Sequence, residues 1–144
     1  MEINGIAHIQ LTANDFGRCR DFYRSLCTFM GMTPVIDADG FLYCVGGRTA
    51  VAVTPADEAY RNERFVQTRI GLHHVCFRAR NREDVDEVHR HATGLGANIV
   101  HPPEEGAWAP GYYSVLFEDP DGIRIEVNFV PGKGLLAKDS SNDS

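Results

Sequence analysis

Hydrophobic and polar residues alternate in a pattern that occurs twice along the chain. Residues 5–13 alternate apolar and polar positions with a period of two, which predicts a half-buried strand. Asn14 and Asp15 offer N-cap chemistry, and apolar residues then recur at helical spacing as far as Gly31, which indicates a helix. Three short strands are predicted next, over residues 33–36, 41–45 and 49–53, separated by the turn signals Asp39-Gly40 and Gly46-Gly47.

The same succession restarts after a polar connection. Residues 72–79 alternate again, and Asn81 can cap a helix whose apolar face ends near Leu95. Asp119-Pro120-Asp121-Gly122 fits a type I turn, because proline and glycine occupy the positions that this turn favours. Three further strands are predicted, over residues 98–101, 112–118 and 123–130.

The two halves also match in detail. His8 and His74 are 66 residues apart, and at the same offset Val75 matches Ile9 and Phe77 matches Leu11. Such a repeat predicts two copies of one strand–helix–three-strand unit, βαβββ, packed together. We assign the parts as a first module at residues 1–54, a connection at 55–69, a second module at 70–131 and a loose, disordered tail at 132–144.

The basic residues narrow the chemistry. The chain has 144 residues and a net charge of −6, and its only lysines are Lys133 and Lys138, in the tail. A folded part without lysine excludes Schiff-base catalysis and a Walker A phosphate loop. The acidic balance disfavours nucleic acid as a partner, since that binding depends on neutralising phosphates.

Other features predict a cytoplasmic protein. The N-terminus lacks the basic start and long apolar core of a signal peptide. No uninterrupted apolar stretch approaches the ~18 residues of a membrane span. The four cysteines form no CxxC pair and are expected to be buried, reduced thiols: Cys19, Cys27, Cys44 and Cys76.

Three residues could together hold a metal ion. The repeat would bring His8 and His74 towards a common centre, because they occupy matching positions in the two modules. Glu126 lies on the polar side of the strand that closes the second module, opposite Ile125 and Val127. Two histidines and one carboxylate make a facial triad, which leaves about three positions open on a six-coordinate metal.

Several neighbours are candidate substrate contacts. Gln10 and Arg124 each lie two residues from a candidate ligand and so share its strand face, as does Cys76. Trp108, in the loop at residues 106–113, either caps the core or lines a pocket. Tyr112 and Tyr113 point to opposite faces, and the sequence leaves open which one faces the candidate ligands.

Three of the other histidines receive no role in the chemistry. His73 points to the strand face opposite His74, towards the helix layer, and we assign it a structural role. His89 and His91 lie on the second helix, and we expect them to be solvated.

The chain resembles the vicinal oxygen chelate superfamily, which includes glyoxalase I, extradiol dioxygenases and bleomycin-resistance proteins. The resemblance spans about residues 5–130, and its most specific motif is the closing turn and strand FEDPDGIRIEV. It implies an α+β fold in which two βαβββ modules form an eight-stranded, cup-shaped mixed sheet with the helices outside. It also implies a homodimer, in which modules pair within or between chains, and metal ligands at His8, His74 and Glu126. The other matching segments are AHIQLTANDF, CRDFYRSLCTFMGM and HHVCFRARNREDVDEV.

The resemblance implies a metal-dependent enzyme, of lyase, isomerase or dioxygenase type. Its substrate would be a small molecule that chelates a divalent metal through two oxygens. Fe(II) or Mn(II) fits the triad best, and Zn, Ni and Co remain open. The carboxylate with which glyoxalase I closes its first module has no counterpart, because the corresponding position is Val51 or Val53. The alternative is therefore a protein that binds or sequesters a small molecule, as bleomycin-resistance proteins do.

Overall fold

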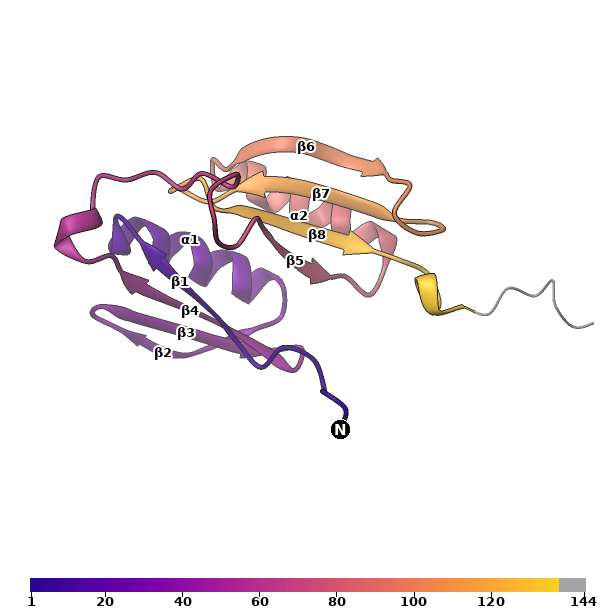
Figure 1. Ribbon diagram of the computed structural model, residues 1–144, viewed down its shortest axis with the longest axis horizontal. Helices are drawn as coiled ribbons and strands as arrows, with labels where there is room; N and C mark the ends of the chain where they lie inside the picture. Colours follow the sequence, from indigo (N-terminus) through magenta and orange to yellow (C-terminus); the bar gives the residue numbers. More distant parts are fainter. Residues whose placement is uncertain (138–144) are drawn as a thin grey trace, which may run out of the picture.

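The computed structural model describes residues 1–137, which form two modules with the same order of elements (Figure 1). The short helix η1 (Glu58–Tyr60) lies in the connection, and η2 (Gly134–Leu136) follows the second module. The first module consists of β1 (Ile9–Ala13), α1 (Phe16–Phe29), β2 (Thr33–Ala38), β3 (Phe41–Gly46) and β4 (Thr49–Pro55). The second module consists of β5 (Val75–Arg78), α2 (Arg82–Gly94), β6 (Asn98–Glu105), β7 (Tyr113–Glu118) and β8 (Arg124–Phe129).

Each module folds its strands into one mixed sheet. The strand orders are β1-β4-β3-β2 and β5-β8-β7-β6, and the first two strands of each order run parallel while the other neighbours run antiparallel. The predicted α+β fold of two βαβββ modules is thereby confirmed. Within residues 1–137 the eight strands form two separate four-stranded sheets, so β1 and β5 each remain at a sheet edge.

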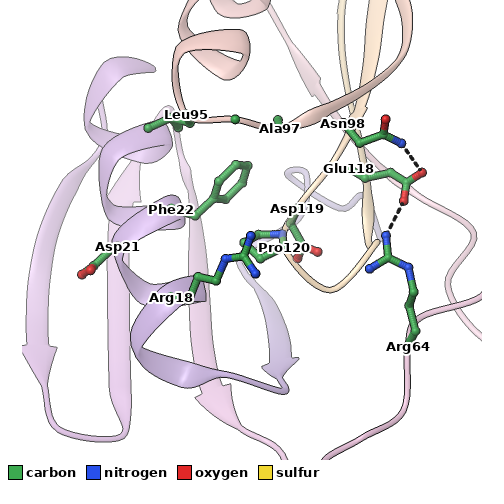
Figure 2. Close-up of a pocket in the computed structure, with 11 residues that line it drawn as sticks. Arg18, Asp21, Phe22, Arg64, Leu95, Ala97, Asn98, Glu118, Asp119 and Pro120 are labelled. Atoms are coloured by element: carbon green, nitrogen blue, oxygen red, sulfur yellow. Dashed lines mark hydrogen bonds and ion pairs between the residues drawn. The ribbon is translucent and has the colours of Figure 1, made fainter.

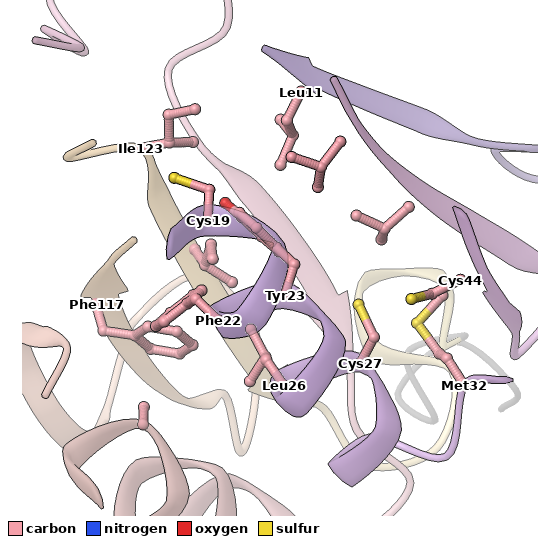
Figure 3. Close-up of a cluster of buried hydrophobic side chains, with 14 of the residues drawn as sticks. Leu11, Cys19, Phe22, Tyr23, Leu26, Cys27, Met32, Cys44, Phe117 and Ile123 are labelled. Carbon is pink, nitrogen blue, oxygen red and sulfur yellow. The ribbon is translucent and has the colours of Figure 1, made fainter. Parts of the chain in front are cut away.

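The helices lie between the two modules rather than only on the outside. The buried face of α1 packs against its own sheet and also contacts α2. Figure 3 shows Phe117 and Ile123 of the second module beside side chains of α1, in one continuous apolar cluster. The two modules therefore share a single core, and this core faces the helical side of both sheets.

Local sequence explains where α1 begins and which face it buries. The Asp15 side chain accepts a hydrogen bond from the Arg18 backbone N–H at 3.1 Å, which satisfies a free donor of the first turn. The buried residues recur three or four positions apart, as a one-sided helix requires. They are Cys19, Phe22, Tyr23, Leu26 and Cys27.

The turn between β7 and β8 docks onto the first module. The Asp119 side chain is 5% exposed, and its Oδ2 accepts a hydrogen bond of 2.5 Å from the Tyr23 hydroxyl on α1. Its Oδ1 accepts from the backbone N–H groups of Asp121 and Ile123, at 2.8 and 2.9 Å. Asp121 in turn accepts from the backbone N–H of Asn14 at 2.7 Å. Burial raises the pKa of Asp119, and the Tyr23 hydrogen bond partly opposes that shift.

Some expectations need correction. Cys19, Cys27 and Cys44 are buried free thiols as predicted, but Cys76 is exposed because its strand face is not covered by the core. His91 is not simply solvated: its ring stacks on Phe29 at 4.1 Å between centroids, since α2 packs against α1. No helix in the described part of the chain is long and apolar enough to cross a membrane. Of the tail, residues 134–136 form η2 and residues 138–144 lie outside the described residues.

Replacing Tyr23 by phenylalanine should destabilise the fold by about 1.5–3 kcal/mol, because it leaves a buried carboxylate oxygen of Asp119 without its donor. The free energy of unfolding in urea measures this loss. Tyr43→Phe is the matched control, since the Tyr43 hydroxyl makes no hydrogen bond within residues 1–137, and it should change stability by less than about 0.5 kcal/mol. Equal effects of the two variants would contradict a role for the Tyr23–Asp119 contact.

Candidate functional site

The candidate site lies on the face of the second sheet that points away from α2, here called the open face. Along β8, Ile125 and Val127 are buried in the core, so Arg124 and Glu126 alternate to the open face. In the parallel ladder of β5 and β8, Cys76 lies beside Glu126. The sheet therefore presents polar side chains from two neighbouring strands at one place.

The structure brings two of the three candidate ligands together, His74 and Glu126. His74 Nε2 lies 3.1 Å from Glu126 Oε2. Two ligand atoms that each stand about 2.1 Å from one metal ion at a right angle lie about 3.0 Å apart. The observed separation thus fits two adjacent ligands of a single ion.

Each of these two side chains is held on its far side. The Tyr112 hydroxyl donates a hydrogen bond to Glu126 Oε1, the oxygen that does not face His74. His73 Nδ1 lies 2.8 Å from His74 Nδ1, which leaves His74 Nε2 directed at Glu126. Partners of this kind fix the orientation of metal ligands. The expectation that His73 faces the helix layer is wrong, because His73 precedes β5 and is free of the strand's alternation.

Two ionisable neighbours stay protonated at neutral pH. Desolvation and the hydrogen bond to Glu126 raise the pKa of Tyr112 to about 12. Desolvation and the Glu126 charge likewise raise the pKa of Cys76 to about 12. Near pH 7 Tyr112 is therefore a hydrogen-bond donor, and Cys76 is a thiol rather than a thiolate ligand.

The structure decides between the two adjacent tyrosines. Tyr112 faces Glu126, whereas the Tyr113 hydroxyl donates to Asp86 Oδ1 of α2 at 2.6 Å. The Arg82 guanidinium also lies over the Tyr113 ring, 3.7 Å from its centroid. Tyr113 thus ties the sheet to α2 and does not contact the open face.

Backbone hydrogen bonds in the loop before β7 fix the position of Tyr112. The Gly106 backbone N–H donates to the Tyr112 carbonyl at 3.0 Å, and the Tyr112 N–H donates to the Ala109 carbonyl at 3.1 Å. Trp108 in this loop is 77% exposed, so the interpretation that it caps the core is wrong. No sequence pattern marks its exposure, because Trp108 lies between β6 and β7 and outside the alternation of either strand.

His8 is the predicted ligand that the single chain does not bring to the others. It lies exposed just before β1, and residues 1–137 contain no group of three or more side chains that could hold a metal ion. The reason is the placement of the modules, since β1 and β5 end two separate sheets. The donor set of one chain thus fits two of the three positions of the predicted triad, His74 and Glu126.

The free face of the first sheet carries neutral groups at the matching place. Gln10 pairs with Ala52 in the parallel ladder, and its side-chain amide donates to the Thr54 hydroxyl at 3.4 Å. Val51 and Val53 are buried against the helical side, so the missing carboxylate corresponds to Ala52 instead of either valine. The position carries no acid in either case.

A groove between the modules lies elsewhere. It has a volume of about 430 Å³ and is lined by Arg18 and Phe22 of α1, by Arg64 of the connection and by Pro120 of the docked turn (Figure 2). None of the predicted site residues lines it, and Arg64 is already engaged by Glu118 at 3.4 Å. The groove is thus a feature of the module interface.

Comparison with known proteins identifies the family. The model of the Glyoxalase/Bleomycin resistance protein/Dioxygenase superfamily matches residues 5–127, and the chain belongs to this superfamily. A curated relative is the uncharacterised protein YqjT of Bacillus subtilis, which is 25% identical over 83% of this chain and 94% of its own.

Solved structures show the same fold. A protein of Bacillus halodurans proposed to be a glyoxalase superposes with a TM-score of 0.76 at 24% identity, over 88% of this chain and 96% of its own. A glyoxalase/bleomycin resistance protein/dioxygenase domain of Frankia has a TM-score of 0.73 at 22% identity, over 89% of this chain and 98% of its own. Lactoylglutathione lyase of Agrobacterium tumefaciens has a TM-score of 0.64 at 23% identity, over 90% of this chain and 96% of its own.

Gly111→Ala should destabilise the protein by more than about 1 kcal/mol, because Gly111 has φ +72° and a Cβ there would stand 2.7 Å from Pro131 Cγ. The free energy of unfolding in urea measures the loss. Gly94→Ala is the control, since that position ends α2 with nothing within 4 Å, and it should be neutral or slightly stabilising. Equal stability of the two variants would contradict the packing of this loop.

Proposed function

We propose that the protein is a metal-dependent enzyme acting on a small oxygenated substrate, of lyase, isomerase or dioxygenase type. A divalent ion would be held by His74 and Glu126 of one chain and by His8 of a second copy. The observation that carries the proposal is the His74–Glu126 pair, with donor atoms 3.1 Å apart and each side chain held from behind. Membership of a superfamily that includes glyoxalases and dioxygenases supports it.

The second copy is invoked because of the free sheet edges. His8 stands just before β1 and His74 just before β5, and both strands lie at edges that pair with nothing within residues 1–137. A twofold dimer that sets β1 of one chain beside β5 of the other would cover both edges and build two equal sites. Each site would then contain His8 from one copy and His74 and Glu126 from the other.

The bound ion would supply Lewis-acid chemistry to two neighbouring oxygens of the substrate. The ligand set carries one negative charge, so a 2+ ion (Fe, Mn, Zn, Ni or Co) keeps a net positive charge that attracts such oxygens. The chain's own residues orient the site: Tyr112 holds the Glu126 carboxylate, and His73 holds the His74 ring. Three buried free cysteines support a cytoplasmic setting.

A binding or sequestering protein is the second candidate function. It is favoured by the neutral face of the first sheet, where Gln10 and Ala52 offer no group that could move a proton. A ligand recovered chemically unaltered after long incubation with the metal-loaded protein would support this candidate and contradict turnover.

Mixing two defective variants tests the shared site. His8→Ala and His74→Ala should each abolish bound metal, whereas a mixture refolded together should recover about a quarter of the wild-type metal content. Half of the dimers in such a mixture are mixed, and each of these holds one intact site. Elemental analysis of protein purified without chelator measures the recovery.

The matched control is a mixture of His74→Ala with Glu126→Gln. Both changes lie in the same module, so no mixed dimer holds an intact site and no metal should return. Full metal content in His8→Ala alone, or equal recovery in the two mixtures, would contradict a ligand from the second copy.

Tyr112→Phe should weaken metal binding by about 10- to 100-fold, because Glu126 loses the donor that orients its carboxylate. The dissociation constant of Mn(II) measures the effect. Tyr113→Phe should leave that constant unchanged, since the Tyr113 hydroxyl binds Asp86 on the helical side. A similar Mn(II) dissociation constant in both variants would contradict the role of Tyr112 in orienting the Glu126 carboxylate.

A further inference from the structure

Arg124 carries an unsatisfied hydrogen-bond donor. Its Nε is the one buried side-chain nitrogen or oxygen atom without a hydrogen-bond partner within residues 1–137. A buried donor without a partner costs about 1–3 kcal/mol, so such a group calls for an explanation. Arg124 opens β8 on the open face, two residues before Glu126.

The natural partner of Arg124 within the sheet is already engaged. Glu118 lies directly across from Arg124 in the antiparallel ladder of β7 and β8. Its carboxylate instead accepts from the Asn98 side chain at 3.0 Å and from Arg64 at 3.4 Å. In the described part of the chain the Arg124 guanidinium has no carboxylate within 4.0 Å. The described residues therefore supply no carboxylate that neutralises its positive charge.

The sheet sets this charge beside the candidate metal ligands. Val75 pairs with Ile125 in the parallel ladder, and His74 directly precedes Val75 just as Arg124 directly precedes Ile125. Glu126 follows on the same face, about 7 Å further along the strand. A ligand of a few atoms can thus reach both the His74–Glu126 pair and the Arg124 side chain.

We infer that Arg124 binds a carboxylate of the substrate. The substrate class is then a small organic anion that carries a carboxylate a few atoms from the two oxygens that face the metal; the second half of this statement rests on the proposed function. A guanidinium matches a carboxylate in shape and charge and forms strong, paired hydrogen bonds with it. The bound carboxylate neutralises the Arg124 guanidinium, for which the described residues supply no ion pair.

Two probes that differ only in the carboxylate test this inference. Catechol and 3,4-dihydroxybenzoate share one pair of neighbouring hydroxyls, and calorimetric titration gives the Kd of each for Mn(II)-loaded and for chelator-treated protein. The wild type should bind the carboxylated probe about 10- to 100-fold more tightly than catechol. Arg124→Met should reduce this ratio to about one, while the affinity for catechol stays the same.

Two further variants control for charge and for folding. Arg18→Met removes an exposed arginine of α1 outside the open face and should keep the wild-type ratio. Arg124→Lys keeps the charge but loses the planar fork, so its ratio should lie between those of the wild type and Arg124→Met. It also carries the test if thermal unfolding shows that Arg124→Met does not fold.

The outcomes separate the two proposals. A ratio near one in the wild type, a preference that survives in Arg124→Met, or no binding of 3,4-dihydroxybenzoate at millimolar concentration overturns the inference. If a carboxylate of a second copy binds Arg124, the wild type should show a ratio near one or no binding of 3,4-dihydroxybenzoate. An Arg124-dependent preference in protein that takes up no metal supports the inference and overturns the metal site alone. Metal-dependent binding of catechol without a carboxylate preference supports the metal site and overturns the inference about Arg124.

Discussion

The arrangement of the molecule depends on one buried contact, the hydrogen bond from the Tyr23 hydroxyl to the Asp119 carboxylate. Asp119 also holds its own turn together, so a single side chain shapes the turn of the second module and fastens it to the helix of the first. A buried carboxylate is costly unless all its oxygens have donors, which makes this placement specific. The contact holds α1 of the first module against the second module, and within residues 1–137 β1 and β5 each lie at the edge of a separate sheet.

That separation explains why the second module carries most of the candidate site. β8 runs in the middle of its sheet, between β5 and β7, and Ile125 and Val127 anchor it in the core. Side chains that alternate with these anchors, Arg124 and Glu126, therefore project from a rigid strand. His74 lies outside regular structure and owes its direction to contacts with His73 and Glu126. The free edge beside it is where a second chain would complete the site.

The sequence could predict whatever depends on neighbours in the chain. Alternation located the strands and put Glu126 on the open face, because its strand buries every second residue. Alternation failed in β4, where residues 50–53 are all buried and the phase is hidden, which misplaced the missing carboxylate at Val51 or Val53. Tyr112 could not be oriented because it lies in the loop just before β7. The placement of the modules could not be predicted either, since it depends on Tyr23 and Asp119, 96 residues apart.

Charge on the open face connects the fold to the type of ligand. The negative charge of Glu126 and the positive charge of Arg124 sum to zero, but the two side chains form no ion pair. Each charge therefore keeps its own local effect. A divalent ion beside Glu126 would make this face strongly positive, although the chain as a whole carries −6. The acidic surface would repel anions in general, and a ligand would gain only where two positive centres stand a few atoms apart. A ligand with one negative group for each centre satisfies both at once, and selection would then follow from the spacing of charges that β8 fixes.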